Sequence, residues 1–591
     1  MSNHPWEKNY PAGLAWDEPL PPAVALESFL EVAAKKWPTR VALDFYDRLI
    51  TFQELHELSL RTAAGLQELG VGPGVNVGLY LPNTPHFVIG FFGTLLAGGQ
   101  VVNFNPFSGS DEFERQLRDS SCKVILAADW VPRYSQLVDV LAPGQLDAVV
   151  VCSLLDFLTA AVAEGLIKRP GNRAERSRLE IDFGRLREST TPLVRHEHGN
   201  LANEVAVLQF TGGTTGETKA AMLTHANFAA VIAISDRWAG AENRSMAKAL
   251  RSVPMMQIMK LTFSMLLAKL GLGEQPTIKT LAVMPFWHIF GLISIMLGAI
   301  VHGLQLVLHL RFDATRVLKD IADKRINVFS GVPAMFAALV NHPQFDRADM
   351  SSLLACGSGG APLPNELRAR FERLTKRSVR EGYGLTEATG LATFPVAPTG
   401  PCEGHRGLPA PGTLVEVVDL ETGLEPLPQG EVGEICLTGA QIMKGYWHKP
   451  GENVEAFRGG RFHTGDVGFI DKDGYLVLSD RKKDMIIVGG HNVYPRNIER
   501  AIYDFPSVME VLVIGIPNKE VGEVVKALIT LSPGKAAFSL GELHSFLKHR
   551  VASYELPFEL EFRESLPKTE VGKLSKNKLL QELNTGHAHP G

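Results

Sequence analysis

The sequence has little cysteine, no excess of positive charge and only one long apolar run. Its 591 residues include five cysteines that are too far apart to form a CxxC pair, so neither a disulfide framework nor a zinc ribbon is indicated. The formal net charge of -5 argues against a nucleic-acid-binding protein that relies on overall positive charge. A reducing, cytoplasmic compartment fits this cysteine usage best.

Neither the N-terminal segment nor the longest apolar run has the pattern of a membrane-targeting segment. Met1 to Glu18 is polar and contains proline, unlike a secretory signal. Phe286 to Leu310 could imitate a membrane span, but it carries His288, His302 and His309, which are costly against lipid. We therefore expect a buried helix followed by a buried strand in this stretch.

Apolar, β-branched runs alternate with amphipathic stretches as far as about Gly404. This alternation predicts an α/β fold with largely parallel sheets. The predicted strands include Val75–Leu81, Lys123–Ala128, Ala206–Phe210, Thr280–Met284 and Asn327–Phe329, and the predicted helices include Phe52–Leu69 and Phe312–Lys324.

The pattern changes after Gly404, where Gly, Pro and Asp turns separate short strands. Residues 404–480 are therefore predicted to form a small antiparallel β subdomain. We place a domain boundary in the charged run Asp480–Asp484, so that residues 1–482 form an N-terminal domain and residues 483–591 a small α/β C-terminal domain. The C-terminal domain is predicted to contain helix Pro495–Asp504, strands Val508–Ile514 and Val525–Leu531, and helix Leu540–Val551.

Two segments look like additions to this framework. Lys168–Arg187 is rich in arginine and polar residues and is predicted to be a surface excursion. Gly240–Lys279 contains the cations Arg244, Lys248, Arg251, Lys260 and Lys269 and five of the 14 methionines. It is either an interfacial helix pair on an anionic membrane or a solvated insert packed on its own domain.

The strongest chemical signal is the run Phe210–Lys219, which follows a buried strand and precedes a helix predicted near Thr224. Its glycines let backbone N–H groups approach a polyanion, and its hydroxyls and lysine add donors. A phosphate-binding loop is favoured over a flexible linker, and the spacing of the glycines excludes a Walker A loop.

This loop resembles the phosphate-binding segment of the adenylate-forming superfamily, which includes acyl-CoA synthetases, luciferases and peptide-synthetase adenylation domains. Thr218 and Ala220 replace the usual proline and glycine, and Lys219 stays in register. The resemblance implies phosphate binding by Thr211, Gly212, Gly213, Thr214, Thr215, Gly216 and Lys219.

Further segments resemble the same superfamily in the same order along the chain. Tyr383-Gly-Leu-Thr-Glu387 is similar to its adenine- and magnesium-binding segment, Thr464-Gly-Asp466 and Arg481 to its ribose-binding residues, and Pro285–Gly291 to the segment that carries a histidine beside the substrate carboxylate. The resemblance implies nucleotide contacts from Tyr383, Gly384, Thr386, Asp466 and Arg481, magnesium binding by Glu387 and Thr214, and catalytic roles for Lys573, His288, Glu387 and Thr214. Without the motif, His288 would be a satisfied core residue.

The C-terminal domain carries two more segments of this resemblance. Pro567–Lys573 is similar to the segment whose lysine reaches the α-phosphate, where an ammonium can stabilise developing charge. Lys483 corresponds to the hinge about which the small domain turns. Gly489 and Gly490 would then leave room for the pantetheine arm of coenzyme A.

The resemblance extends from about Leu26 to Leu579 and is strongest to medium- and long-chain fatty acyl-CoA synthetases. It implies that ATP, Mg²⁺ and coenzyme A act with a fatty acid, without nucleic acid. Transfer to a carrier protein, a luciferase-like oxygenase and a non-enzymatic nucleotide sensor are the alternatives. Peripheral membrane association and a dimeric state stay open from sequence.

Overall fold

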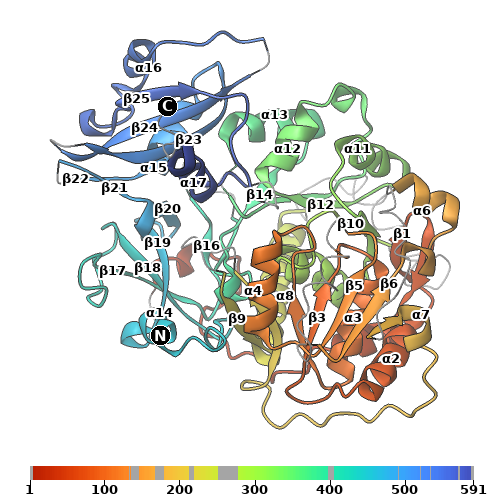
Figure 1. Cartoon of the computed structure of the whole chain (residues 1–591). Coiled ribbons are helices and arrows are strands. Elements are labelled where there is room, and N and C mark those ends of the chain that lie inside the picture. The colour runs from red at the N-terminus through yellow and green to blue at the C-terminus, as the bar shows by residue number, and fades with distance from the viewer. Residues whose placement is uncertain are drawn as a thin grey trace.

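The chain folds into two large sheets, a smaller β-rich unit and a C-terminal unit, as the computed structural model shows (Figure 1). The described residues are 4–131, 134, 146–166, 179–211, 218–250, 277–361, 363–396, 405–489, 491–518, 521–532, 534–569 and 573–586.

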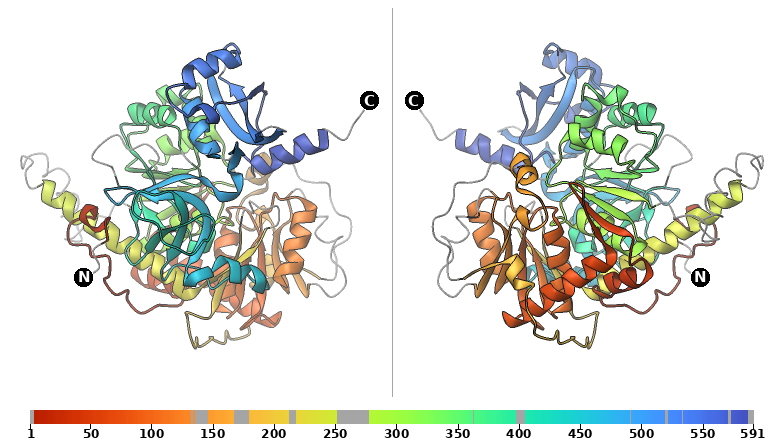
Figure 2. Two further views of the ribbon diagram at one scale, coloured as in Figure 1. Left: turned by 90° about the vertical axis from the view of Figure 1, so that its left-hand side faces the viewer. Right: turned by 90° about the vertical axis from the view of Figure 1, so that its right-hand side faces the viewer.

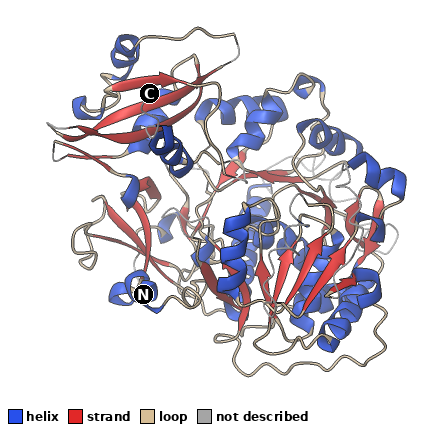
Figure 3. Cartoon of the chain, viewed as in Figure 1, coloured by secondary structure: helices blue, strands red, loops and turns tan. Residues whose placement is uncertain are grey.

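The first seven-stranded sheet has the order β7-β6-β5-β3-β4-β8-β9 and is parallel except for the β8–β9 pair. β3, β5 and β6 are buried throughout, as expected for parallel strands with helices on both faces (Figure 3). The strands are β3 (Asn76–Tyr80), β4 (Gln100–Asn103), β5 (Val124–Ala128), β6 (Ala148–Cys152), β7 (Glu180–Asp182), β8 (Val205–Phe210) and β9 (Ala220–Thr224), with helices α2 (Phe52–Glu68), α3 (Pro85–Leu96), α4 (Ser110–Ser120), α6 (Ala160–Leu166) and α7 (Phe183–Leu186).

The second seven-stranded sheet has the order β14-β13-β12-β10-β11-β1-β2, and only the β1–β2 pair is antiparallel. The predicted α/β fold with largely parallel sheets is confirmed. The strands are β1 (Val41–Phe45), β2 (Arg48–Thr51), β10 (Lys279–Ala282), β11 (Gln305–Leu308), β12 (Val328–Gly331), β13 (Ala355–Ser358) and β14 (Val379–Glu381), with helices α1 (Ser28–Lys36), α8 (His225–Leu250), α10 (Gly298–His302), α11 (Ala314–Asp323), α12 (Pro333–Val340) and α13 (Asn365–Thr375).

The antiparallel structure predicted after Gly404 is confirmed as a four-stranded sheet, β17-β18-β19-β20. Its apolar side chains join the same continuous core as the two large sheets. The elements are β17 (Leu414–Val418), β18 (Gly433–Thr438), α14 (Pro450–Ala456), β19 (Phe462–Ile470) and β20 (Leu476–Arg481), with the short pair β15 (Thr393–Phe394) and β16 (Leu408–Pro409) beside them.

The C-terminal unit has its own sheet, in which β25 pairs in parallel with β24 and the other strands are antiparallel. Two hydrophobic clusters, separate from the large core, lie on its two faces. It comprises β21 (Ile486–Val488), β22 (His491–Val493), α15 (Pro495–Tyr503), β23 (Val508–Asn518), β24 (Gly522–Leu531), α16 (Leu540–Leu547), β25 (Glu559–Phe562) and α17 (Lys576–Gly586).

Within Phe286–Leu310, the predicted buried helix and strand are confirmed as a π-helix (Gly291–Leu297), α10 and β11. None of the described helices combines the length and the apolar composition needed to cross a membrane. The helix predicted near Thr224 is α8, which extends away from the large sheets (Figure 2). The last part of α8, from Gly240 to Leu250, is the beginning of the Gly240–Lys279 segment. Residues 251–276 of that segment lie outside the described residues.

The prediction that Lys168–Arg187 is a surface excursion is wrong for its described part, residues 179–187. β7 pairs in parallel with β6 and extends the first sheet. The next residue, Phe183, is fully buried against Phe157 and His86. One aromatic anchor in an otherwise polar segment therefore fixes it to the core, and the polar composition concealed that anchor.

Candidate active site

A cavity of about 1670 Å³ lies where the large sheets, the β-rich unit and the C-terminal unit meet. Segments that are far apart in the sequence converge on it. The predicted site residues that line it are Thr211, Lys219, His288, Tyr383, Gly384, Thr386, Glu387, Asp466, Arg481 and Lys573. Gly212, Gly213, Thr214, Thr215, Gly216 and Gly490 lie outside the described residues.

The predicted phosphate-binding segment, which we call the Gly/Thr loop (residues 211–219), connects the antiparallel strands β8 and β9 of the first sheet. Phe210 pairs with Ala220, and the Thr211 N–H donates to the Lys219 carbonyl oxygen at 2.8 Å, which closes the base of the loop. The strand β9, which lies between this loop and the helix predicted near Thr224, was not predicted from the sequence. The Lys219 ammonium forms an ion pair with Glu452 and lies 5.1 Å from the Tyr446 ring centre.

Asp466 is the centre of a buried polar group at the end of the β-rich sheet. It pairs with Arg481 across β19 and β20, and its Oδ1 lies 2.5 Å from the Arg481 Nε. The Tyr383 hydroxyl donates to Asp466 Oδ2, and burial raises the pKa of that tyrosine. Thr464 Oγ1 accepts the Asp466 N–H at 3.0 Å. These bonds fix a carboxylate whose remaining lone pairs can accept hydroxyl groups.

Glu387 presents a second carboxylate to the cavity. It lies in a 3-10 turn (Thr386–Ala388), and its Oε1 accepts the Tyr446 hydroxyl at 2.9 Å. Burial raises the pKa of Glu387, since the charged form loses hydration. A bound cation would restore the ionised form, so the oxygen donor and its burial fit a hard ion such as Mg²⁺.

The backbone around His288 is held by contacts across the two large sheets. Asn83 donates to the carbonyl oxygens of Ala282 and Met284 at 3.0 and 2.8 Å and accepts the Phe286 N–H at 2.8 Å. Gly291 passes so close to the Pro285 carbonyl that a Cβ would come within 2.1 Å of its oxygen. The turn between these residues therefore requires glycine at its end.

The environment of His288 determines its protonation. Burial and the charge of Lys573 lower the pKa of His288 to about 3, so the ring is neutral near pH 7. Its Nδ1 accepts the Phe290 N–H at 3.2 Å. The ring proton is therefore on Nε2, and this atom is the hydrogen-bond donor that His288 can offer a ligand.

Lys573 brings the C-terminal unit into the cavity. Its Cε and Nζ lie so close to Gly360 that a Cβ at that glycine would be 2.6 and 2.9 Å from them. Burial and the charges of Arg481 and Arg496 lower the pKa of Lys573 to about 8. The ammonium is therefore mostly charged at pH 7, and it lies in a region where its field is weakly screened.

Residues of α8, the π-helix, α10, β10 and β12 line one part of the cavity, which we call its arm. The His302 Nε2 and the Asp236 Oδ1, 3.3 Å apart and each about half exposed, lie along this arm. The arm is lined by Val231, Ile232, Ser235, Asp236, Thr280, Ile295, Gly298, Ala299, His302 and Val328. It can hold a long apolar chain whose polar end lies beside His288.

Two predicted residues lie outside the cavity lining. Lys483 is in the turn Lys482–Asp484 between β20 and β21, where the chain passes from the β-rich unit to the C-terminal unit. Gly489 has a φ of 57° and lies at the turn between β21 and β22. Neither is among the described residues that line the cavity.

Three residues around the cavity were missed from the sequence. Tyr446 contacts both Glu387 and Lys219, Glu452 pairs with Lys219, and Arg496 lines the cavity from α15. Tyr446 reaches the site because its segment pairs with β9 through an Ala221–Tyr446 bridge. No local spacing pattern encodes that pairing.

Two family models match most of the chain. The model for the AMP-binding enzyme matches residues 30–447, and the model for the AMP-binding enzyme C-terminal domain matches residues 497–573.

The chain is similar to known proteins over most of its length. The chain is 34% identical to a long-chain-fatty-acid--CoA ligase of Bacillus subtilis (strain 168), covering 99% of both chains. It is 31% identical to a feruloyl-CoA synthase of an Amycolatopsis species, covering 92% of this chain and 96% of the relative. A solved structure of o-succinylbenzoate coenzyme A synthetase from Bacillus subtilis, in complex with ATP and magnesium ion, is 26% identical, with a TM-score of 0.69 and coverage of 93% and 99%.

Proposed function

Since this chain belongs to the AMP-binding enzyme family, we propose that it joins a long-chain fatty acid to coenzyme A through an acyl-adenylate, with release of AMP and pyrophosphate. The observation that carries this proposal is the meeting of Lys573 with Tyr383, Asp466 and Arg481 in one cavity. A lysine from a separate unit is not needed merely to bind a nucleotide. It is suited to a reaction that builds charge between two substrates.

In the first step, a carboxylate oxygen of the fatty acid attacks the α-phosphorus of ATP. The bond from that phosphorus to the bridging oxygen breaks, and pyrophosphate leaves with the bonding electrons. The Lys573 ammonium stabilises negative charge on the carboxylate and the α-phosphate. His288 Nε2–H donates to the carboxylate and aims its other oxygen at phosphorus.

The other residues hold the nucleotide in place. Tyr383 packs on the base, and Asp466, fixed by Arg481, accepts the ribose hydroxyls. Thr211, Lys219 and the loop between them bind the phosphates. Glu387, with Thr214, would hold Mg²⁺, which supplies charge neutralisation at the phosphates when bound.

In the second step, the coenzyme A thiolate attacks the acyl carbon and AMP departs as the carbon–oxygen bond breaks. The C-terminal unit turns about Lys483 between the steps, so that Lys573 withdraws and Gly489 and Gly490 face the pantetheine arm. Two arrangements are needed because the two steps require different groups at the same carbon.

The mainly apolar lining of the arm supports a long acyl chain. If the arm holds the acyl chain, a larger side chain in the middle of the arm will shift the enzyme's preference toward shorter fatty acids. Gly298 lines the arm, and a Cβ there would meet only the Ile293 carbonyl oxygen, at 3.5 Å. A larger side chain at this position can therefore enter the arm without backbone overlap.

We expect Gly298→Leu to lower kcat/KM for palmitate by about 15-fold relative to octanoate, because losing room for about two methylenes costs about 1.6 kcal/mol. Gly165→Leu is the matched control, since Gly165 is an exposed helical glycine with open space around it. Both variants are measured for acyl-CoA formation. Equal losses on both acids would contradict the placement of the acyl chain.

A methyl group at Gly360 tests the docking of Lys573. We expect Gly360→Ala to slow acyl-adenylate formation by about 10- to 100-fold, because the methyl displaces the ammonium by about an ångström. Coenzyme A attack on supplied acyl-AMP should be unaffected. Gly360 has a φ of 80°, so Gly70→Ala, at a φ of 82° with no atom in reach, controls for backbone strain. Losses of the same size in both variants would mean that strain, not Lys573, is responsible.

The acceptor is tested by replacing coenzyme A with an acyl carrier protein in a thioester assay. We expect thioester only with coenzyme A, and transfer to the carrier at a similar rate would favour an acyl-AMP ligase.

Membrane association through Gly240–Lys279 stays a prediction, tested by deleting that segment and measuring binding to anionic vesicles. The oligomeric state, including a dimer, is likewise to be measured.

A further inference from the structure

Five histidine and carboxylate residues gather at the end of the first sheet that lies away from the Gly/Thr loop. We call Glu27, His196, His198, Glu204 and His225 the histidine–carboxylate cluster. Glu27 immediately precedes α1, and His225 begins α8. Of the described residues that line the cavity, none belongs to the cluster. The proposed reaction therefore leaves its arrangement unexplained.

Three donor atoms of the cluster lie close together, and two of them, His198 Nδ1 and Glu204 Oε2, form a hydrogen bond. The His198 Nδ1 lies 2.5 Å and the His196 Nε2 lies 3.6 Å from the Glu204 Oε2. The ligand atoms that these three residues offer all lie within 4.8 Å of one another. Zinc with bonds of about 2.0–2.2 Å holds tetrahedral donor atoms about 3.4 Å apart, so small side-chain shifts would complete such a set.

The backbone fixes the Glu204 carboxylate in this position. Its Oε1 accepts the N–H groups of Gly199 and Asn200 at 2.6 and 2.8 Å. The carboxylate is thereby held with Oε2 toward the two imidazoles. His196, His198 and Glu204 are 27%, 14% and 29% exposed at their side chains, so an ion and its remaining water ligands can reach them.

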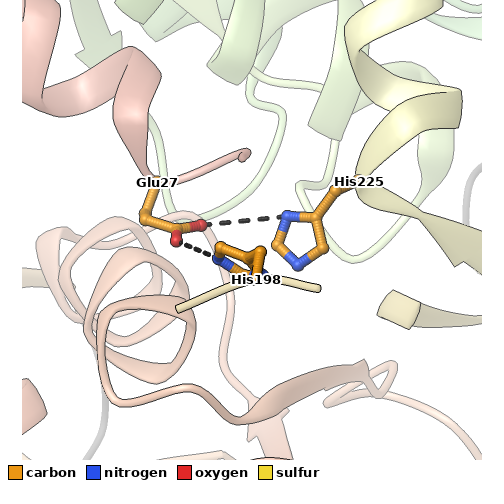
Figure 4. A group of neighbouring side chains, drawn as sticks. All are labelled: Glu27, His198 and His225. Atoms are coloured by element: carbon orange, nitrogen blue, oxygen red, sulfur yellow. Dashed lines mark hydrogen bonds and ion pairs between the residues drawn. The ribbon is translucent and has the colours of Figure 1, made fainter. Parts of the chain in front are cut away.

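Glu27 fixes the other side of the His198 ring. Figure 4 shows the contact between the Glu27 carboxylate and the His198 ring, in which Oε1 and Nε2 are 2.7 Å apart. A carboxylate that accepts the second N–H of a histidine holds the ring in one orientation and leaves the opposite nitrogen as the ligand. Glu27 is 9% exposed, and its Oε2 has no hydrogen-bond partner among the described residues.

The alternative set, Glu27, His198 and His225, is less suited to a metal. The Leu26 N–H donates to His225 Nδ1 at 3.0 Å, so the lone pair nearest to Glu27 is already used. The Glu27 Oε2 lies 3.8 Å from that nitrogen (Figure 4). His225 therefore packs beside His198 but does not add a further donor atom to the set formed by His196, His198 and Glu204.

We propose that His196 Nε2, His198 Nδ1 and Glu204 Oε2 bind a divalent transition metal ion, with Zn²⁺ the best match, and that Glu27 positions His198. Two imidazoles and one carboxylate are donors that zinc accepts. Through Glu27, the ion would link the segment before β8 to α1. The proposed ion would therefore lie at the end of β8 and β9 that is opposite to the Gly/Thr loop.

The test is zinc binding by the full chain after chelator treatment, measured by calorimetry with Mg²⁺ in excess. We expect the parent to bind one zinc ion more than His196→Gln, and His549→Gln, which changes an exposed histidine of the C-terminal unit, to match the parent. Glu27→Gln should keep the site but weaken it by about 10- to 100-fold. Cobalt(II) should give visible absorption bands in the parent that His196→Gln lacks.

Two results would overturn the proposal. One is the same zinc stoichiometry in the parent and His196→Gln. The other is unchanged affinity in Glu27→Gln, since a chance pair of surface histidines would not depend on a buried carboxylate. Acyl-CoA formation by His196→Gln should equal that of the parent, so the outcome is independent of the proposed function.

Discussion

Replacing Lys573 with alanine is expected to lower the rate of acyl-adenylate formation by about 100- to 1,000-fold, the loss typical of removing one preorganised electrostatic donor. Lys573 is the cation that the C-terminal unit brings to Gly360, beside His288. In the proposed reaction, its ammonium contacts developing charge only in the first step. Thioester formation from supplied acyl-AMP should therefore stay close to the rate of the parent.

Two half-reactions measured separately distinguish this role from a structural one. Pyrophosphate release reports the first, and coenzyme A consumption with synthetic acyl-AMP reports the second. Lys548→Ala removes an exposed lysine after α16 in the same unit and should change neither. If Lys573→Ala slowed both half-reactions equally, the lysine would be holding the unit together and not assisting adenylation.

Asp466→Asn is expected to lower kcat/KM for ATP by about 100-fold, since hydrogen bonds to a charged group contribute about 1.5–3 kcal/mol. The carboxylate is 1% exposed and anchors both Tyr383 and Arg481. Asparagine keeps the shape but offers one acceptor oxygen, so either a ribose hydroxyl or an existing partner loses its bond. The Arg481 guanidinium also loses its counter-charge.

Asp320→Asn is the matched control for this variant. Asp320 is also buried and paired, with its Oδ2 2.8 Å from His309 Nε2, but it lies on α11 outside the described cavity lining. We expect it to cost stability and leave the KM for ATP unchanged. An Asp466→Asn enzyme that is folded and keeps the parent KM for ATP would remove this residue from the nucleotide site.

The fold was predictable because its signals are local. Alternating apolar and amphipathic stretches predict parallel strands and helices wherever each run is buried, as in β3 and β5. The turn-rich region after Gly404 likewise predicted antiparallel strands. The prediction of a surface excursion failed at residues 179–187, where one buried side chain, Phe183, outweighs a polar composition.

The candidate site was only partly predictable, because its contacts join distant segments. The motifs identify Asp466 and Tyr383 separately, but only the fold shows that the hydroxyl of one bonds the carboxylate of the other. Tyr446 carries no motif and reaches Glu387 through strand pairing. Glu27, which positions His198 in the histidine–carboxylate cluster, lies 171 positions from it, so that contact was not predictable from the sequence either.

In the proposed reaction, the chain converts a long-chain acid to its coenzyme A thioester through an adenylate formed in this one cavity. The most direct measurement quantifies every product from ATP, Mg²⁺ and palmitate, with and without coenzyme A, and repeats it with acetate. We predict equal amounts of AMP, pyrophosphate and palmitoyl-CoA with coenzyme A, enzyme-bound palmitoyl-AMP without it, and little turnover of acetate. Formation of ADP and phosphate, or fastest turnover on acetate, would contradict the account.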